Sequence, residues 1–162
     1  MKAIVAVYHD KSDSHWGIGA NGTQPLVLTA DRKFFRATTN GSTVIVGHTT
    51  FLDFPNQQPL PNRKNIVLTR KDIQINNVEI VHDIQDLLDK DLHNAFVIGG
   101  ASIYKQLFPY YDEIYITHVY QDIHPDVFFP NISQDSDWNC QEIASGFEND
   151  IEFKIEKYTK KE

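Results

Sequence analysis

The stretch Ala95-Phe96-Val97-Ile98-Gly99-Gly100-Ala101-Ser102-Ile103 joins a short apolar run to two glycines and then to a helical pattern that continues to Phe108. A run of this length and composition is typical of a strand buried on both faces. Thr43-Val44-Ile45-Val46-Gly47 has the same form, and residues 48–52 after it have the pattern of a helix start. Strands that alternate with helices in this way predict an α/β fold with a mostly parallel sheet.

The other predicted elements extend this pattern along the chain. Further strands are expected at residues 2–8, 65–69, 78–81 and 114–120, helices at 29–37 and 83–88, and a terminal antiparallel hairpin at 138–145 and 151–158. In the helix at 29–37, Thr29 is the expected N-cap, and the apolar positions 30, 34 and 37 form one stripe. No repeat or linker divides residues 1–162, so we expect a single domain.

The composition excludes several classes of protein. The 162 residues include 15 Lys and Arg against 22 Asp and Glu, and the net charge of −7 argues against nucleic-acid binding. No stretch approaches the roughly 18 apolar residues of a membrane span, and the first apolar run is too short for a secretion signal. The one cysteine, Cys140, permits no internal disulfide, and we expect it to be a buried, inert thiol. These features favour a cytoplasmic protein with no membrane partner.

Both strand–glycine–helix junctions are candidate anion sites. Backbone N–H groups are unpaired in the first turn of a helix, and glycine lets a ligand approach the backbone closely. Such turns are also common in α/β proteins, so a pyrophosphate site and a plain structural turn remain alternatives at this point. Residues 17–22, Gly-Ile-Gly-Ala-Asn-Gly, match G-x-G-x-x-G, but polar residues precede them and Pro25 follows. We therefore interpret this segment as a glycine-rich loop rather than a dinucleotide-binding motif.

Asp31 lies in the first turn of the helix expected at 29–37, beside Phe34 and Phe35. In one interpretation it is a carboxylate stabilised by the helix dipole. In the other it faces an apolar pocket, where desolvation raises its pKa so that it exchanges a proton near neutral pH. The seven histidines are scattered, and no metal-binding pattern occurs, so no metal site is expected.

Six segments, taken in order, resemble bacterial dihydrofolate reductases over nearly the whole chain. They are residues 17–22, 29–35, 44–51, 59–70, 97–104 and 114–118. Each segment is weak alone, whereas the ordered set is specific. The resemblance implies a single-domain α/β fold with a mixed, mostly parallel eight-stranded sheet flanked by helices, and reduction of dihydrofolate to tetrahydrofolate with NADPH.

The resemblance also implies which residues bind the substrate. Asp31 would hold the pterin through two hydrogen bonds, Thr117 would support that network, and Arg63 would pair with the glutamate α-carboxylate. Because N5 must gain a proton as hydride reaches C6, Asp31 and Thr117 are the expected catalytic residues. The implied substrate-binding set is Val5, Leu26, Asp31, Phe35, Leu60, Arg63, Ile98 and Thr117.

For NADPH, the resemblance implies a pyrophosphate held at Gly99, Gly100 and the following amides, with Thr50 opposite and Tyr104 near the nicotinamide. The glycine-rich segment 17–24 would close over the cofactor. The implied cofactor set is Ala6, Ile18, Gly19, Gly47, His48, Thr49, Thr50, Leu68, Thr69, Arg70, Ile98, Gly99, Gly100, Ala101, Ser102, Ile103 and Tyr104. The expected partners are dihydrofolate and antifolate inhibitors, and the expected state is a monomer.

Three positions depart from the family pattern. Leu26 stands where the family usually has tryptophan, Thr29 replaces a proline two residues before the acid, and His48 replaces an arginine that commonly contacts the cofactor 2′-phosphate. Arg70 is then the permanent charge of that subsite. Because imidazole loses its charge near neutral pH, we expect NADPH binding to weaken as pH rises through the titration of His48.

Three other hypotheses stay open from the sequence. A pyrimidine reductase of the riboflavin pathway, on the same fold, would share the glycine pair but not Asp31, Phe35 and Arg63. A folate- or nucleotide-binding protein without turnover is compatible with Leu26. A structural or interaction domain would leave the glycine junctions and Arg63 unexplained.

Overall fold

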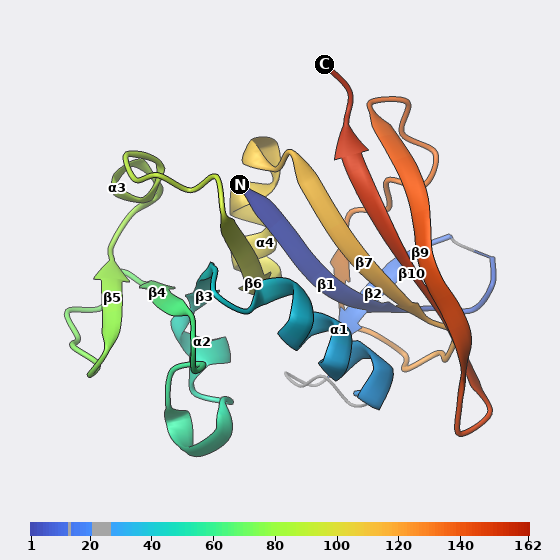
Figure 1. The fold of residues 1–162 in the computed structure, drawn as a ribbon, viewed down its shortest axis with the longest axis horizontal. Coiled ribbons are helices and arrows are strands. Elements are labelled where there is room, and N and C mark those ends of the chain that lie inside the picture. The colour runs from blue at the N-terminus through green and yellow to red at the C-terminus, as the bar shows by residue number, and fades with distance from the viewer. Residues whose placement is uncertain (13, 21–26) are drawn as a thin grey trace.

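The computed structural model describes residues 1–12, 14–20 and 27–162, and one sheet runs through them. Eight strands follow one another in the order β5-β4-β3-β6-β1-β7-β10-β9 (Figure 1). The strands are β1 (Lys2–Tyr8), β2 (Trp16–Gly19), β3 (Thr43–Gly47), β4 (Lys64–Leu68), β5 (Val78–Val81), β6 (Ala95–Gly99), β7 (Glu113–Val119), β8 (Val127–Phe129), β9 (Trp138–Glu148) and β10 (Ile151–Lys160). Strand β2 pairs with β1 and β8, which extends the sheet to ten strands in the described part of the chain.

The sheet is parallel from β5 to β7 and antiparallel at the C-terminal hairpin, as the sequence predicts. The central strands are apolar along their whole length because both of their faces are covered. Val44, Ile45 and Val46 of β3 and Val97 of β6 have no exposed surface. The mixed α/β sheet expected from the resemblance is confirmed.

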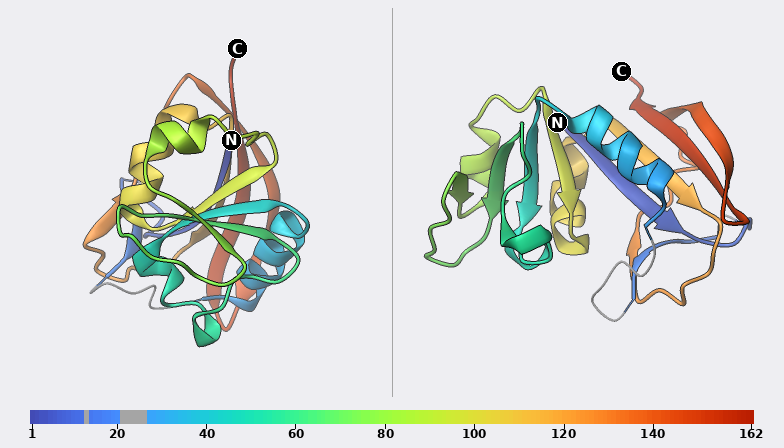
Figure 2. Two further views of the ribbon diagram at one scale, coloured as in Figure 1. Left: turned by 90° about the vertical axis from the view of Figure 1, so that its left-hand side faces the viewer. Right: turned by 60° about the horizontal axis from the view of Figure 1, so that its bottom comes forward.

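Helices cover both faces of this sheet. They are α1 (Thr29–Thr39), α2 (His48–Phe51), α3 (Ile84–Leu88) and α4 (Ala101–Leu107), with short 3-10 helices at Pro55–Gln57 and Phe108–Tyr110. Helix α1 lies on one face and α4 on the other, with the sheet between them (Figures 1 and 2). No helix of the described residues is long and apolar enough to cross a membrane.

Residues 16–19 form strand β2, so the prediction of a loop at residues 17–22 was wrong where the structure describes it. Gly17 pairs with Tyr8 of β1 and with Phe128 of β8. A Cβ atom on Gly17 would lie only 2.4 Å from Pro125, which explains why glycine occupies this strand. The strand could not be recognised from the local sequence because its partner, β8, lies more than 100 residues away. Residues 21–26, which include Leu26, lie outside the described residues.

The buried stripe of α1 differs from the predicted one. Ala37 is exposed, whereas Phe34, Phe35 and Thr38 are half-buried and face the sheet. Helix α1 runs two residues further than expected, to Thr39, whose hydroxyl donates to the Phe35 carbonyl at 2.8 Å.

Thr29 is not the N-cap of α1, contrary to the prediction. Leu28 takes that position and offers no side-chain hydrogen bond. The backbone N–H groups of Thr29 and Ala30 donate instead to the carboxylate of Glu148, at the end of β9. A tertiary contact therefore replaces the local cap that the sequence suggested.

Cys140 is exposed on β9, so the prediction of a buried residue was wrong. Its sulfur is nevertheless turned towards Glu156, to which the thiol donates at 3.2 Å. Partial burial of the sulfur and the neighbouring Glu156 raise the thiol pKa to about 11. The thiol therefore stays protonated at neutral pH and is a weak nucleophile, in agreement with the expected inertness.

Candidate functional site

The two strand–glycine–helix junctions lie side by side, because β3 and β6 are neighbouring parallel strands. The peptide bond between Gly99 and Gly100 is cis, and Gly99 has a φ of 132° that favours glycine. A Cβ on Gly100 would lie 2.7 Å from the Thr50 hydroxyl oxygen, and a Cβ on Gly47 would lie 2.9 Å from Ile103. A side chain at Gly100 or Gly47 would force Thr50 or Ile103 to shift, so both junctions favour glycine, and α2 and α4 meet closely there.

A third strand end adds basic side chains to this edge of the sheet. Leu68 of β4 pairs with Gly47, so Thr69 and Arg70 follow β4 where His48 follows β3. Because the carboxyl ends of parallel strands share one edge, these residues belong to the same region.

His82 follows β5 at the same edge and was not predicted from the sequence. Its Nδ1 donates to the Thr69 carbonyl at 2.9 Å. The sequence offered one indication of His82, because this residue directly follows a predicted strand. In the structure that strand, β5, pairs with β4, which ends at Leu68.

Asp31 lies in the first turn of α1 and is bound by Thr117 of β7. Burial raises the pKa of Asp31, and the hydrogen bond from the Thr117 hydroxyl offsets part of this effect. Thr117 is only 2% exposed, so the hydroxyl that binds Asp31 is shielded from water. Of the two interpretations left open by the sequence, the structure favours a carboxyl in an apolar setting.

Tyr104 connects Asp31 with the glycine junctions. Its hydroxyl donates to the Ile4 carbonyl at 2.7 Å, and the residue belongs to α4, which begins after Gly100. Burial first, and then the charges of Tyr111 and Asp31, raise the pKa of Tyr104 well above its usual range. The phenol is therefore neutral and close enough to Asp31 to sense its charge.

Arg63 is held at the C-terminal end of α1. Its Nε donates to the Pro61 carbonyl at 2.8 Å, and one terminal nitrogen donates to the Thr39 hydroxyl at 3.1 Å. The guanidinium carbon lies 5.9 Å from the centre of the Phe35 ring. These contacts orient the guanidinium beside the apolar face of α1.

The loop that bears Leu60 and Arg63 is fixed by Asn65, a positioning residue that the sequence analysis missed. The Asn65 side chain accepts from the Leu60 N–H at 2.9 Å and donates to the Leu60 and Arg63 carbonyls. Asn65 is 2% exposed, so it is a buried polar residue whose bonds define one loop conformation.

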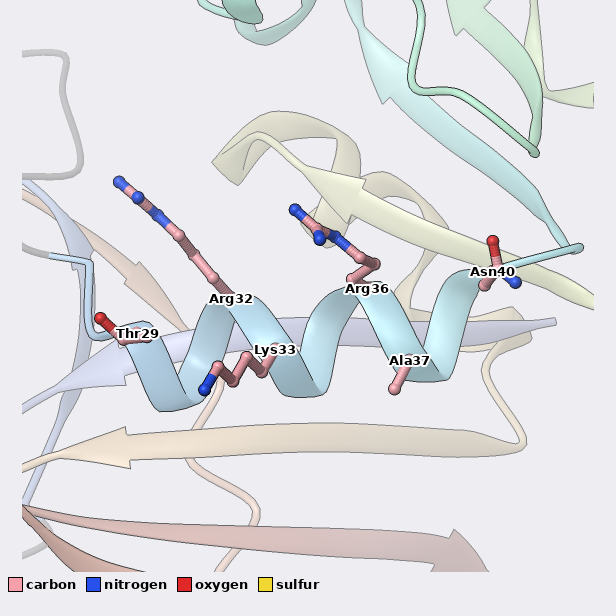
Figure 3. Close-up of a pocket in the computed structure, with 6 residues that line it drawn as sticks. All are labelled: Thr29, Arg32, Lys33, Arg36, Ala37 and Asn40. Carbon is pink, nitrogen blue, oxygen red and sulfur yellow. The ribbon is translucent and has the colours of Figure 1, made fainter.

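A basic hollow of about 510 Å³ lies along α1. Figure 3 shows that Arg32 and Arg36 extend from the same side of the helix. The hollow is lined by Thr29, Arg32, Lys33, Arg36, Ala37 and Asn40. Burial and the charge of Arg36 lower the pKa of Arg63, which shows that these two guanidinium groups are near each other. Arg36 was not among the predicted site residues.

The other predicted residues lie on the expected elements. Ala6 of β1 pairs with Thr117, and Val5 packs in the main core cluster with Tyr104. Ile98 of β6 packs instead with Val46 and other apolar residues of the β3–β4 region. The structure thus does not bring Val5 and Ile98 into one cluster. Of the remainder, Ile18 and Gly19 lie in β2, Thr49 in α2, and Ala101 and Ser102 in α4.

The fold and site together define an α/β protein with a glycine-lined, basic sheet edge and a half-buried carboxyl whose pKa is raised. The family model described as dihydrofolate reductase matches residues 2–160. The chain belongs to the dihydrofolate reductase family of enzymes.

Individual relatives agree with this assignment. The chain is 34% identical to dihydrofolate reductase from Bacillus subtilis (strain 168) over 155 residues, covering 92% of this chain and 90% of the relative. It is 31% identical to the enzyme from Staphylococcus aureus (strain Mu50), covering 95% and 91%. A solved structure of dihydrofolate reductase from Enterococcus faecalis, complexed with NADP(H) and RAB-propyl, superposes with a TM-score of 0.78 at 29% identity, covering 100% of this chain and 97% of that one.

Proposed function

We propose that the chain reduces 7,8-dihydrofolate to 5,6,7,8-tetrahydrofolate with NADPH. The observation that supports this most strongly is Asp31, whose carboxyl has a raised pKa and is bound by Thr117. It lies beside the sheet edge formed by Gly47, Gly99 and Gly100, which we call the glycine edge. Family membership supports the same reaction. We also propose that the protein acts as a cytoplasmic monomer with small-molecule partners.

Asp31 binds the pterin ring and donates the proton that N5 requires. Hydride addition to C6 of a neutral imine leaves negative charge on N5, so protonation must accompany it. The raised pKa of Asp31 keeps a larger fraction of the carboxyl protonated at a given pH. Thr117 orients the carboxyl, and catalysis otherwise depends on holding the reactants close together.

The glycine edge fits a dinucleotide. Gly99 and Gly100 carry no side chains of their own, the Thr50 side chain lies against Gly100, and the N–H groups of Ala101, Ser102 and Ile103 follow in the first turn of α4. NADPH supplies the hydride when bound. His48, Thr69, Arg70 and the newly identified His82 are available for its 2′-phosphate, and Tyr104 lies between this edge and Asp31.

The substrate tail is assigned to Arg63 and the basic hollow. Arg63 pairs with the α-carboxylate of the glutamate, because a guanidinium binds a carboxylate through two parallel bonds. Arg36, close enough to Arg63 for their charges to interact, is available for the second carboxylate. Phe35 and Leu60 form apolar walls between the tail and the pterin.

Replacing Arg63 by lysine tests this assignment. Arg63→Lys is expected to raise KM for dihydrofolate by about tenfold, or about 1.4 kcal/mol, with kcat retained, because lysine lacks the planar fork. Steady-state kinetics would measure this. A dihydropterin without the glutamate tail serves as the control substrate, and its KM should not change. An unchanged KM for dihydrofolate in the variant would refute the role of Arg63.

The replacement of arginine by His48 leads to a second prediction. His48→Arg is expected to tighten NADPH binding, because a guanidinium carries a permanent charge and can bind a phosphate through two parallel bonds. NADH, which lacks the 2′-phosphate, should bind the variant and the wild type about equally. Fluorescence titration of both cofactors, with His48→Gln for comparison, would measure the Kd values. The same Kd for NADPH in His48→Arg and in the wild type would contradict this prediction.

A turnover assay separates the proposed reaction from the alternatives. Loss of NADPH absorbance on addition of dihydrofolate supports it. Tight binding of both ligands without turnover would favour a binding protein, and turnover of a pyrimidine substrate alone would favour the related reductase.

A further inference from the structure

The hairpin β9–β10 reaches the N-terminal end of α1, the helix that bears Asp31. Glu148 is the last residue of β9, and its two carboxylate oxygens accept from the Thr29 N–H at 2.7 Å and the Ala30 N–H at 3.0 Å. Leu28 at the N-cap offers no side-chain hydrogen bond, so Glu148 supplies the cap from outside the helix.

The position of Glu148 is fixed by the geometry of the hairpin. Glu148 pairs with Ile151 across the turn formed by Asn149 and Asp150, which have φ values of 51° and 64°. Asparagine and aspartate tolerate this left-handed conformation better than most residues, so the turn is well defined.

The same hairpin is joined to Thr117. Ile155 of β10 pairs directly with Thr117 of β7. The paired strands β7, β10 and β9 therefore hold Asp31 at two points. Thr117 of β7 binds its carboxyl, and Glu148 of β9 binds the helix turn that bears it.

We propose that Glu148 is a positioning residue of the active site, which holds the first turn of α1 so that Asp31 stays against Thr117. This inference rests on the proposed dihydrofolate reduction. The hydrogen bonds from Thr29 and Ala30, with a smaller contribution from the charge of Lys33, lower the pKa of Glu148. Glu148 is therefore a carboxylate at neutral pH, and the cap is lost only when acid protonates it.

Loss of the cap has a defined consequence for Asp31. The freed N–H groups place partial positive charge next to the carboxyl, and fraying of the first turn admits water. Both changes favour the ionised form, so the pKa of Asp31 falls. The groups around this site are the Thr117 hydroxyl on β7, which binds Asp31, the neutral Tyr104 phenol on α4, which senses the charge of Asp31, and Glu148 on β9, on which the charge of Lys33 acts.

The test compares Glu148→Ala with Asp150→Asn. Asp150→Asn removes the same charge from the same hairpin tip and keeps a residue type that suits the turn. Glu148→Ala is expected to lower kcat/KM for dihydrofolate by about fivefold, the factor that corresponds to about 1 kcal/mol for a lost cap. KM for NADPH should stay within about twofold of the wild-type value, a change of about 0.4 kcal/mol.

The pH profile distinguishes positioning from a general loss of stability. In Glu148→Ala, the fall of kcat with rising pH should move to lower pH, whereas destabilisation alone would not move it. Glu148→Gln keeps an acceptor oxygen and should recover most of the activity, which also guards against a folding defect in the alanine variant.

Two results would overturn the inference while wild-type turnover is normal. One is an unchanged pH profile and kcat/KM in Glu148→Ala, with or without a lower Tm. The other is an equal effect in Asp150→Asn. Absence of turnover in the wild type would instead reject the proposed function itself.

Discussion

Asp31→Asn is expected to lower kcat/KM for dihydrofolate by about 100-fold or more at neutral pH, within the range for loss of a general acid. The amide has nearly the same shape as the carboxyl but neither gives nor takes a proton. In the wild type, kcat should fall as pH rises through the raised pKa of Asp31, since the protonated carboxyl is then lost. In the variant, this dependence should disappear. Stopped-flow measurement of the chemical step across the pH range provides the test.

A stability measurement controls for misfolding of Asp31→Asn. Because burial raises the pKa of Asp31 above its unfolded value, its stabilising contribution is present at low pH and is lost as pH rises through the folded pKa. The neutral amide avoids this loss, so the variant should unfold at or above the wild-type Tm near neutral pH. Full activity with normal stability would show that Asp31 is not the acid.

Gly100→Ala is expected to weaken NADPH binding by about fivefold to 150-fold, the range that corresponds to overpacking by about 1–3 kcal/mol. The added Cβ would lie 2.7 Å from the Thr50 hydroxyl oxygen and would occupy the space next to the backbone. Fluorescence titration measures the Kd directly.

Two further variants identify the cause of that effect. Thr50→Ala removes the atom that the new Cβ meets, so the double variant should regain part of the affinity if the contact with Thr50 contributes. Gly146→Ala, in β9 and outside the proposed site, controls for the general effect of replacing glycine. Wild-type affinity in Gly100→Ala would remove the glycine pair from the cofactor site.

The parts of the fold that follow from local pattern were predictable from the sequence. The apolar runs in β3 and β6 and the glycines after them are each contained in fewer than ten residues. That both glycine junctions lie at one edge follows from the rule that parallel strands end at one edge, whereas the direct pairing of β3 with β6 does not, because β4 and β5 lie between them in the sequence. The carboxyl at Asp31 could be located, but not its environment, because burial depends on β7 and α4 as well as on α1.

The features that the sequence concealed all depend on distant partners. Strand β2 exists because β1 and β8 flank it, and Pro125 explains the glycine at position 17. The cap of α1 comes from Glu148, 119 residues beyond Thr29. His82 joins the basic edge only through the pairing of β4 with β5. Neither periodicity nor propensity within one segment reports such contacts.

Transfer of deuterium from NADPH labelled at the reactive carbon of the nicotinamide tests the proposed function most directly. With dihydrofolate as the acceptor, we expect one deuterium at C6 of tetrahydrofolate, detected by mass spectrometry and NMR. The N5 proton should come from solvent. Asp31→Asn should form the same labelled product much more slowly. Oxidation of NADPH without labelled product, or tight binding of both ligands without any transfer, would show that the chain does not catalyse this reduction.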